Sequence, residues 1–396
     1  MTTQADRRAP RRLARGTILA AAMLTIMAPA VVSPSLPTME QVFAAEPGAA
    51  LLVRLAMTIT SLMIAVSAPL SGLIADRAGR RPLLVTALLL YAISGTAGFF
   101  VTDLYVLVAT RAVLGIAIGG VMTAVSSTVA DWFDGPKRAA FLGLQQAFAS
   151  LGGVVFLPLA GVLATISWRV PFWLYSLAAV VALFAILSVQ DRPRETAAAV
   201  APDAPATRGT LGRVFGIYLL ALGVTVLFYM APTQVPFRLE SLGVGPAVVG
   251  VVLAGSTLSS LLGALAFPVV RKRLGFTAII TGAVALLGAG WLLIGSTDSV
   301  LGTAAGLLVG GAGLGLSVPN VTLRLSELAA PAWRGRVLSG LVSGIFLGQF
   351  LSPLLIQPLI EAVGVGGAFT TAGIAMVTGA ALAAAGFRIR TERKIR

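Results

Sequence analysis

Residues 72–81, Gly72-Leu73-Ile74-Ala75-Asp76-Arg77-Ala78-Gly79-Arg80-Arg81, place four charges within six positions between two long apolar runs. Only 11% of the 396 residues are charged and 57% are hydrophobic, so this concentration of charge and glycine stands out. The flanking runs are long enough to cross a bilayer, and a short charged segment between them predicts a tight turn outside the lipid. The stretch therefore predicts a protein that crosses the membrane several times.

The hydropathy pattern predicts an all-α membrane protein with twelve transmembrane helices. A mean hydropathy of +0.94 is too high for a soluble fold, which would have to leave a largely apolar surface in water. Runs of about 20 apolar residues cross roughly 30 Å of hydrocarbon. Twelve such runs can be drawn, at residues 17–37, 51–72, 82–101, 105–128, 139–163, 168–188, 212–233, 246–269, 276–296, 300–323, 336–359 and 365–387.

The distribution of basic residues predicts how the chain is oriented. All but four of the 29 Lys and Arg residues lie in the tails or in alternate connections; the others are Arg54, Arg111, Arg169 and Arg238. By the positive-inside rule both termini are expected in the cytoplasm, at a bacterial-type cell (inner) membrane. The net charge of +14 also predicts attraction to anionic lipid headgroups. Nucleic-acid binding is disfavoured, because the charge is scattered over many loops.

The two halves of the sequence are related by a shift of 196 positions. This shift superposes Arg77 on Arg273 and Asp131 on Glu327, and it also aligns several glycines. A duplicated six-helix unit is predicted, with a polar linker between the copies. The expected domains are a cytoplasmic tail (1–16), an N-terminal six-helix bundle (17–188), a cytoplasmic linker (189–211), a C-terminal six-helix bundle (212–387) and a cytoplasmic tail (388–396).

The residue types that are missing exclude several chemistries. The chain has no Cys and no His, which removes disulfides, thiolate metal sites and the commonest proton shuttle. No nucleotide-binding loop and no paired acids are present, so an enzyme or an ATP-driven pump is disfavoured. Neither a metal site nor a cofactor is expected.

The spacing Gly72-x3-Asp76-Arg77-x-Gly79-Arg80-Arg81 resembles the loop between the second and third helices of the major facilitator superfamily. The resemblance covers the whole chain and implies two pseudo-symmetric six-helix bundles that transport by alternating access. It also implies a gating role for this loop. Asp76 would face the start of the eleventh helix in the outward-facing state, and Arg80 and Arg81 would reach Asp131. The alternative is that these charges only enforce the topology.

Coupling to protons is expected to involve a cation inside the membrane. Arg111 lies in the fourth predicted helix, and an arginine at membrane depth is by default a functional-site hypothesis. Arg111 and Gly115 resemble the fourth-helix motif of the superfamily, which is associated with proton coupling. Glu40 and Arg54 are the other coupling candidates. The alternative is that Arg111 reaches the interface to meet Asp103 or Glu40.

The fifth predicted helix carries a partial antiporter signature. Gly153, Pro158 and Gly161 resemble that signature, and the resemblance implies packing against the eighth and eleventh helices, where Gly348 and Pro353 offer a narrow surface. Simple close packing of small residues is the alternative. The end of the first helix, residues 34–39, resembles the drug:proton antiporter subfamily.

A substrate cavity is expected between the halves. None of the 15 acidic residues falls in the middle of a predicted span, which favours neutral, apolar or anionic substrates. The candidates to line the cavity are polar or adaptable side chains, each of which could instead serve helix packing. They are Met23, Met27, Gln145, Gln146, Tyr229, Asn320, Gln349 and Gln357.

These observations together predict a secondary transporter that exports small amphipathic, drug-like compounds, most similar to the twelve-helix drug:proton antiporters. The expected partners are a small-molecule substrate, protons and membrane lipid, and the protein is expected to be a monomer. A proton-coupled uptake permease for a small organic anion, with Arg111 as the anion partner, remains an alternative. A transporter-like sensor is a more remote one.

Overall fold

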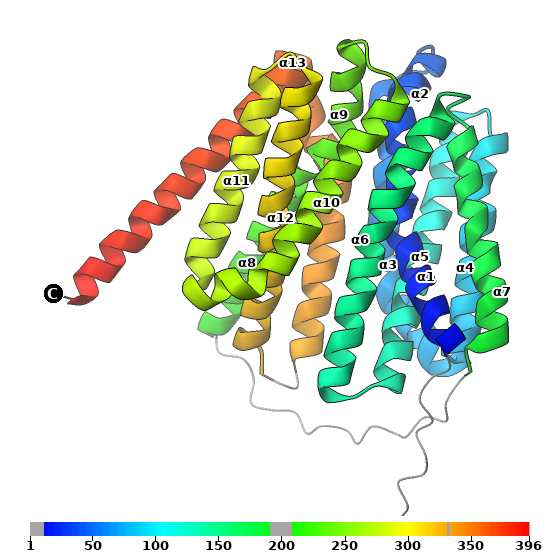
Figure 1. Cartoon of the computed structure of the whole chain (residues 1–396), viewed down its shortest axis with the longest axis horizontal. Helices are drawn as coiled ribbons and strands as arrows, with labels where there is room; N and C mark the ends of the chain where they lie inside the picture. Colours follow the sequence, from blue (N-terminus) through cyan, green and yellow to red (C-terminus); the bar gives the residue numbers. More distant parts are fainter. Residues whose placement is uncertain (1–11, 191–207, 331–332, 396) are drawn as a thin grey trace, which may run out of the picture.

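The computed structural model of this chain describes residues 12–190, 208–330 and 333–395. Within these ranges the chain folds into long helices that run side by side (Figure 1). The N-terminal half contains α1 (Arg12–Ala30), η1 (Ser33–Ser35), α2 (Leu36–Val42), α3 (Ala49–Ala78), α4 (Arg80–Phe100), α5 (Leu104–Trp132), α6 (Gly135–Ala164), η2 (Val170–Ser176) and α7 (Leu177–Ser188). The C-terminal half contains α8 (Arg208–Phe228), α9 (Met230–Ser241), α10 (Pro246–Arg273), α11 (Phe276–Ser296), α12 (Val300–Leu328) and α13 (Arg334–Ile395).

The helices supply the twelve membrane spans that the sequence predicts. In the described ranges, 11 helical segments are long and apolar enough to cross a bilayer, and the last of them covers 52 residues. That last segment contains two spans, because Gly364 in α13 has a non-helical φ of 72° and divides the helix. The part of α13 after Gly364 runs obliquely, and its far end lies apart from the other helices (Figure 1).

Corresponding helices of the two halves begin in the same way. The Asp103 side chain accepts a hydrogen bond from the Val106 backbone N–H at 2.8 Å and caps α5. The Ser299 hydroxyl accepts one from Gly302 at 3.0 Å and caps α12. Such caps satisfy backbone donors that have no partner within the helix. Asp103 and Ser299 are related by the shift of the sequence repeat, so the duplication extends to this local detail.

Glycines allow close helix contacts inside each half. A Cβ atom on Gly115 of α5 would lie 2.9 Å from the Cα of Thr60 in α3. In the other half, a Cβ atom on Gly311 of α12 would lie 3.2 Å from the carbonyl carbon of Ser256 in α10. Membrane helices associate through such small residues because lipid provides no hydrophobic drive between them. The repeated glycines of the sequence therefore mark equivalent packing seams.

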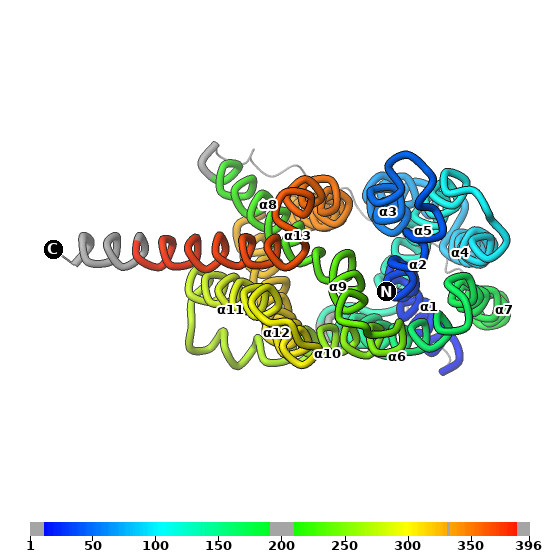
Figure 2. The backbone as a smooth tube through the Cα atoms, turned by 90° about the horizontal axis from the view of Figure 1, so that it is seen from above, coloured from blue at the N-terminus to red at the C-terminus, as the bar shows by residue number. Residues whose placement is uncertain are grey.

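The two halves meet along α6 and α10, along α3 and α13, and through α2 and α9 at one end. Seen from above, α3, α4, α5 and α7 form one group and α8, α11, α12 and α13 the other, with α6, α9 and α10 near the boundary (Figure 2). We call the end that carries Glu40, Arg54 and Glu240 the Arg54 end, at the top of Figure 1. The opposite end, with Arg80 and Asp131, is the Arg80 end.

Candidate functional site

The loop between α3 and α4 is held by two arginines that contact α5 and α7. The Arg80 Nε donates to Asp131 Oδ2 at 3.0 Å, and Arg80 Nη1 lies 3.5 Å from Asp76 Oδ1. Arg81 donates to the Ile186 carbonyl oxygen at 2.7 Å. The carboxylates of this network are substantially exposed, so the ion pairs position the loop more than they stabilise the fold. The contact of Arg80 with Asp131 is the one that the family resemblance implies.

The glycines of the same loop have different surroundings. Gly79 ends α3 with φ of 96°, a left-handed conformation that favours glycine. Gly72 faces open space, since a Cβ atom there would meet no atom within 4 Å, and the Arg77 side chain is exposed. Gly335, in the first turn of α13, is equally open. Both the loop and the start of α13 therefore have free space beside them in this conformation.

Arg111 is packed inside the N-terminal half. Its side chain is 1% exposed, and its Nη2 donates to the Ser94 and Gly95 carbonyl oxygens of α4 at 2.6 and 2.7 Å. The guanidinium carbon lies 4.9 Å from the ring centre of Phe172 and 5.0 Å from that of Tyr175. Two carbonyl dipoles and two aromatic faces stabilise a buried guanidinium. Arg111 thus joins α4, α5 and η2.

Tyrosines extend this packing to α1. The Tyr175 hydroxyl donates to the Ala28 carbonyl oxygen at 2.6 Å, and the Tyr91 hydroxyl donates to that of Leu24 at 2.7 Å. The contacts that the structure describes for Arg111 involve these aromatic and backbone partners and the Thr110 hydroxyl, and include neither Glu40 nor Asp103. The three coupling candidates are therefore divided between two places.

Glu40 and Arg54 lie between the two halves, at the Arg54 end. Arg54 is 4% exposed, and its Nη1 donates to Glu40 Oε2 at 2.7 Å within the N-terminal half. Across the interface, Arg54 Nε donates to Gln234 Oε1 of α9 at 3.2 Å. The guanidinium carbon also lies 3.9 Å from the ring centre of Phe237. We refer to Glu40, Arg54, Gln234 and Phe237 as the Arg54 cluster.

Two further hydrogen bonds join the halves near this cluster. The Gln41 side-chain amide donates to Glu240 Oε1 at 2.8 Å, between α2 and α9. The Ser33 hydroxyl donates to the Pro232 carbonyl oxygen. The first and seventh spans both change direction here, α1 through η1 into α2 and α8 into α9. These breaks bring short helical segments of both halves into contact and close the Arg54 end.

Neutral polar side chains meet between the halves farther from this end. The Ser61 hydroxyl, near the middle of α3, is 2.7 Å from Gln349 Oε1 of α13. Tyr229, at the break between α8 and α9, lies beside Ser61 and packs against the core of the N-terminal half. The structure thus brings together two of the predicted cavity residues, Tyr229 and Gln349, and adds Ser61.

The other cavity candidates lie at separate places. Met27 is completely buried in the core of the N-terminal half and Met23 is half-buried against that core. Asn320 donates to the Phe276 carbonyl oxygen of α11 at 3.0 Å, and Gln357 donates to Glu361 at 3.2 Å. The Asn320 hydrogen bond joins two helices, as the helix-packing alternative proposes, whereas Gln357 and Glu361 lie one turn apart in α13. Gln145 is half-buried and Gln146 is exposed on α6.

The antiporter-like helix α6 packs tightly on α10 of the other half. A Cβ atom on Gly161 would lie 3.1 Å from the Cα of Ala247 and closer still to the carbonyl oxygen of Pro246. Reciprocally, a Cβ atom on Gly250 of α10 would lie 3.1 Å from the Cα of Pro158. Gly153 faces the Thr257 and Ile26 side chains. The backbones of α6 (the fifth span) and α10 (the eighth span) therefore lie in close contact.

Gly348 of the eleventh span has a different neighbour from the one expected. A Cβ atom there would lie 2.9 Å from the Leu222 carbonyl oxygen and 3.1 Å from the Thr225 Cβ, both in α8. Ser352 likewise donates to the Val226 carbonyl oxygen of α8. The narrow face of this span thus serves packing within the C-terminal half, because α13 must approach α8 there.

Sequence reasoning missed the C-terminal partners of the Arg54 cluster. Gln234 and Phe237 lie in a polar, proline-containing segment, and Gln41 and Glu240 flank the same junction. Arg54 was itself one of the four basic residues outside the tails and the alternate connections that carry the other Lys and Arg residues, which is the available signal. In residues 12–190, 208–330 and 333–395, no group of three acidic side chains is arranged to hold a metal ion.

Comparison with known proteins agrees with the fold. The family model described as Major Facilitator Superfamily matches residues 18–353. The tetracycline resistance protein, class C, of Escherichia coli is 27% identical over 346 residues, which are 82% of this chain and 83% of that protein. The bacillibactin exporter of Bacillus subtilis is 24% identical over 352 residues, 83% of this chain and 85% of the relative.

A shorter match to a curated protein and a solved structure with the same fold add to this comparison. The niacin transporter NiaP of Acinetobacter baylyi is 28% identical over 136 residues, 34% of this chain and 31% of that protein. The crystal structure of a D-xylose-proton symporter superposes with a TM-score of 0.75 at 18% identity, covering 93% of this chain and 96% of that one. The chain therefore belongs to the major facilitator superfamily and is a membrane transporter, not an enzyme.

Proposed function

We propose that this transporter exports small amphipathic compounds across the inner membrane in exchange for protons. The observation that carries the proposal is the match to two relatives over more than four fifths of the chain. One is named for tetracycline resistance and the other for export of bacillibactin. The resemblance extends through both halves, between which the substrate path of this proposal lies.

The conformation fits one stage of alternating access. With the Arg80 end in the cytoplasm, as the distribution of Lys and Arg favours, the Arg54 cluster faces the outside. The contacts of Arg54 with Gln234 and of Gln41 with Glu240 then close the outer side. Rocking of the two halves around a site between them would break these contacts and open that side.

The residues between the halves favour a substrate without a fixed charge. Ser61, Tyr229 and Gln349 are neutral and meet near the middle of the bundle. They offer hydrogen bonds between the two halves, and small-molecule sites commonly orient amphipathic ligands with a few such polar groups. In this proposal Glu40 and Arg54 serve coupling, and the buried Arg111 holds α4, α5 and η2 together.

Uptake of a small organic anion is a second candidate, supported by the shorter match to a niacin transporter. That candidate relies on Arg111 as the partner of the anion. Arg111 is 1% exposed and enclosed by two carbonyl oxygens and two rings, although its Nη1 has no hydrogen-bond partner among the described residues. An anion would have to enter the packing between α4, α5 and η2 to reach it, so the geometry favours export.

Asp76→Asn is expected to reduce transport about fivefold or more without reducing the amount of inserted protein. A carboxylate beside a helix N-terminus contributes typically 0.3–1 kcal/mol, and up to about 2 kcal/mol when partly buried. The family resemblance implies that Asp76 faces the start of α13 in one state, and the open space at Gly72 and Gly335 leaves room for that approach. The loss therefore affects one state of the cycle.

The measurement is the initial rate of transport, normalised to membrane abundance. Glu46→Gln, which neutralises an exposed acid in the connection between α2 and α3, is the matched control. Wild-type rates in Asp76→Asn at equal abundance would show that the loop charges serve topology alone.

Export itself is tested by cell retention of a fluorescent apolar compound. Cells that make the wild-type protein should retain several-fold less compound than cells with an empty vector, and a protonophore should remove the difference. Higher retention with the wild type than with the vector would replace export by uptake. A difference that persists with the protonophore would refute proton coupling and leave the direction established.

A further inference from the structure

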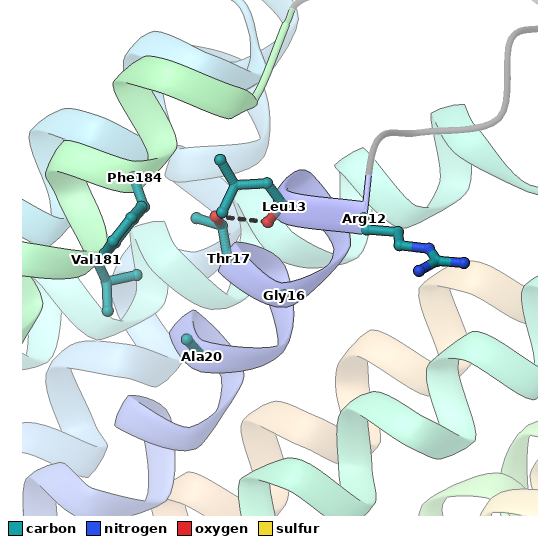
Figure 3. A pocket seen from close by; sticks show the side chains of 7 residues that line it. All are labelled: Arg12, Leu13, Gly16, Thr17, Ala20, Val181 and Phe184. Atoms are coloured by element: carbon teal, nitrogen blue, oxygen red, sulfur yellow. Dashed lines mark hydrogen bonds between the residues drawn. The ribbon is translucent and has the colours of Figure 1, made fainter.

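A groove of about 390 Å³ lies between α1 and α7, on the outer face of the N-terminal half. Leu13, Gly16, Thr17 and Ala20 of α1 form one wall, and Val181 and Phe184 of α7 form the other (Figure 3). In Figures 1 and 2 the beginning of α1 lies at the periphery of the bundle, beside α7. The volume is within the range of ligand pockets, roughly 300–1,000 Å³.

The wall of the groove that α1 forms projects little, because it contains small residues. Gly16 has no side chain, and a Cβ atom there would meet nothing within 4 Å. Ala20, one turn farther along α1, adds only a methyl group. Phe184 and Val181 face these small residues from α7 (Figure 3). A leucine at position 16 would therefore fill space in the groove without pushing helices apart.

The polar group inside the groove is already satisfied. The Thr17 hydroxyl donates to the Leu13 carbonyl oxygen at 2.9 Å and lies 3.1 Å from the hydroxyl of Ser188. The Thr17 hydroxyl is consequently engaged, and apart from Arg12 the other residues that line the groove have no polar side-chain group. Since the groove opens on the lateral surface of a membrane protein, a hydrocarbon chain is the occupant that matches its lining.

The place of the groove along the bundle indicates which chemical group the ligand carries besides its hydrocarbon chain. The contact of Thr17 with Ser188 and that of Arg81 with Ile186 place the groove at the Arg80 end. Arg12, in the first turn of α1, stands at the rim, where its exposed side chain extends away from Phe184 (Figure 3). A cation at the mouth of an apolar groove matches a phosphate attached to an acyl chain.

We propose that this groove binds one acyl chain of an anionic phospholipid, with the phosphate of the headgroup held at Arg12. On the orientation proposed above, the lipid comes from the cytoplasmic leaflet, whose surface is negative. Its chain wedges between α1 and α7, which belong to the same half. The lipid should therefore stabilise that half in every stage of transport, independently of the direction of transport.

The test compares purified full-length variants in detergent. Gly16→Leu fills the groove, and Gly216→Leu is the matched control, because Gly216 is an exposed helical glycine of α8 that also has no atom within 4 Å of a Cβ position. Arg12→Ala removes the cation. Native mass spectrometry measures retained phosphatidylglycerol and phosphatidylcholine, and thermal unfolding is followed with each lipid and with glycerol phosphate.

The wild type and Gly216→Leu should retain phosphatidylglycerol about fivefold better than phosphatidylcholine, the factor for about 1 kcal/mol per arginine at an anionic surface. Arg12→Ala should lose this preference, and Gly16→Leu should retain less of both lipids. Equal retention by Gly16→Leu and the wild type would overturn the groove as the site. Equal stabilisation by glycerol phosphate would reduce it to an anion site without a chain. Neither measurement involves transport, so failure of the export proposal leaves this result unaffected.

Discussion

Gly161→Val is expected to reduce transport at least tenfold while the protein is still inserted in the membrane. A Cβ atom at Gly161 would lie 3.1 Å from the Ala247 Cα and nearer to the Pro246 carbonyl oxygen. Both neighbours are backbone atoms of α10, which cannot rotate away, so the added methyl groups must separate α6 from α10. Overpacking of this kind costs typically about 1–3 kcal/mol, and here the cost applies to the contact between the halves.

Gly153→Val should have a smaller effect than Gly161→Val. A Cβ atom at Gly153 would lie 2.8 Å from the Thr257 Cγ2 and 3.2 Å from the Ile26 Cγ2. These are the ends of side chains, which can move. Gly143→Val is the matched control on α6, because Gly143 is exposed and has no atom within 4 Å of a Cβ position.

The measurement is the transport rate per inserted molecule for the three variants and the wild type. The order of decreasing rate should be Gly143→Val, then Gly153→Val, then Gly161→Val. If Gly143→Val is impaired as much as Gly161→Val, the α6–α10 contact is not the cause. If Gly161→Val transports normally, the two halves do not depend on this close approach.

The membrane spans could be predicted from the sequence because hydropathy over about 20 residues reflects a requirement of the bilayer itself. The repeat was equally accessible, since Asp103 and Ser299 occupy equivalent caps and Gly115 and Gly311 equivalent contacts. The Arg80–Asp131 pair followed from the family resemblance. These features are local or repeated, so neighbouring residues carry the information.

Contacts between helices required the rotation of each helix, which the sequence does not give. Arg111 illustrates the difficulty, because its depth in the membrane was evident but its direction was not. Its partners are the Ser94 and Gly95 carbonyl oxygens, and backbone carbonyls have no signature in the sequence. Gly348 was expected to face the fifth span, yet it faces Leu222 and Thr225 of its own half.

The α9 partners in the Arg54 cluster were missed for a related reason, whereas Glu40 and Arg54 themselves were expected as coupling candidates. Gln234 of α9 is separated from Arg54 by 180 residues. The breaks at the first and seventh spans bring them together, but such breaks are poorly defined by hydropathy. Functional sites of transporters are commonly formed at such discontinuous helices, so proline-containing ends of spans merit more weight than deeply buried charges.

Arg54→Gln should shift the protein away from the conformation that is closed at the Arg54 end. The variant loses the hydrogen bond to Gln234 and the contact with the Phe237 ring, both of which exist only while the halves touch. Hydrogen bonds to charged groups contribute about 1.5–3 kcal/mol and desolvated cation–π contacts about 2 kcal/mol. Part of this stabilisation is offset because water hydrates the separated groups in the open conformation. We therefore expect the closed conformation to lose about 2 kcal/mol relative to the open one, which lowers the closed-to-open ratio roughly 30-fold.

Crosslinking across the interface measures this shift directly, because the chain has no native cysteine. Gln41→Cys and Glu240→Cys replace two side chains that are 2.8 Å apart in the closed conformation. A short bifunctional thiol reagent should join them rapidly in the otherwise wild-type protein and slowly when Arg54→Gln is added. Transport should stop on crosslinking and return when a cleavable reagent is reduced.

Arg238→Gln is the matched control for this experiment. Arg238 also lies in α9 at the Arg54 end, but it pairs with Asp298 and with the Thr297 carbonyl oxygen of its own half. Its loss should leave the crosslinking rate unchanged, because the contacts it makes persist when the halves separate. Equal rates in Arg54→Gln and the wild type would refute the cluster as a closing contact. Equal slowing in both arginine variants would instead indicate that any loss of positive charge at this end weakens closure. The cause would then be repulsion among the carboxylates at this end, not the loss of the specific contacts of Arg54.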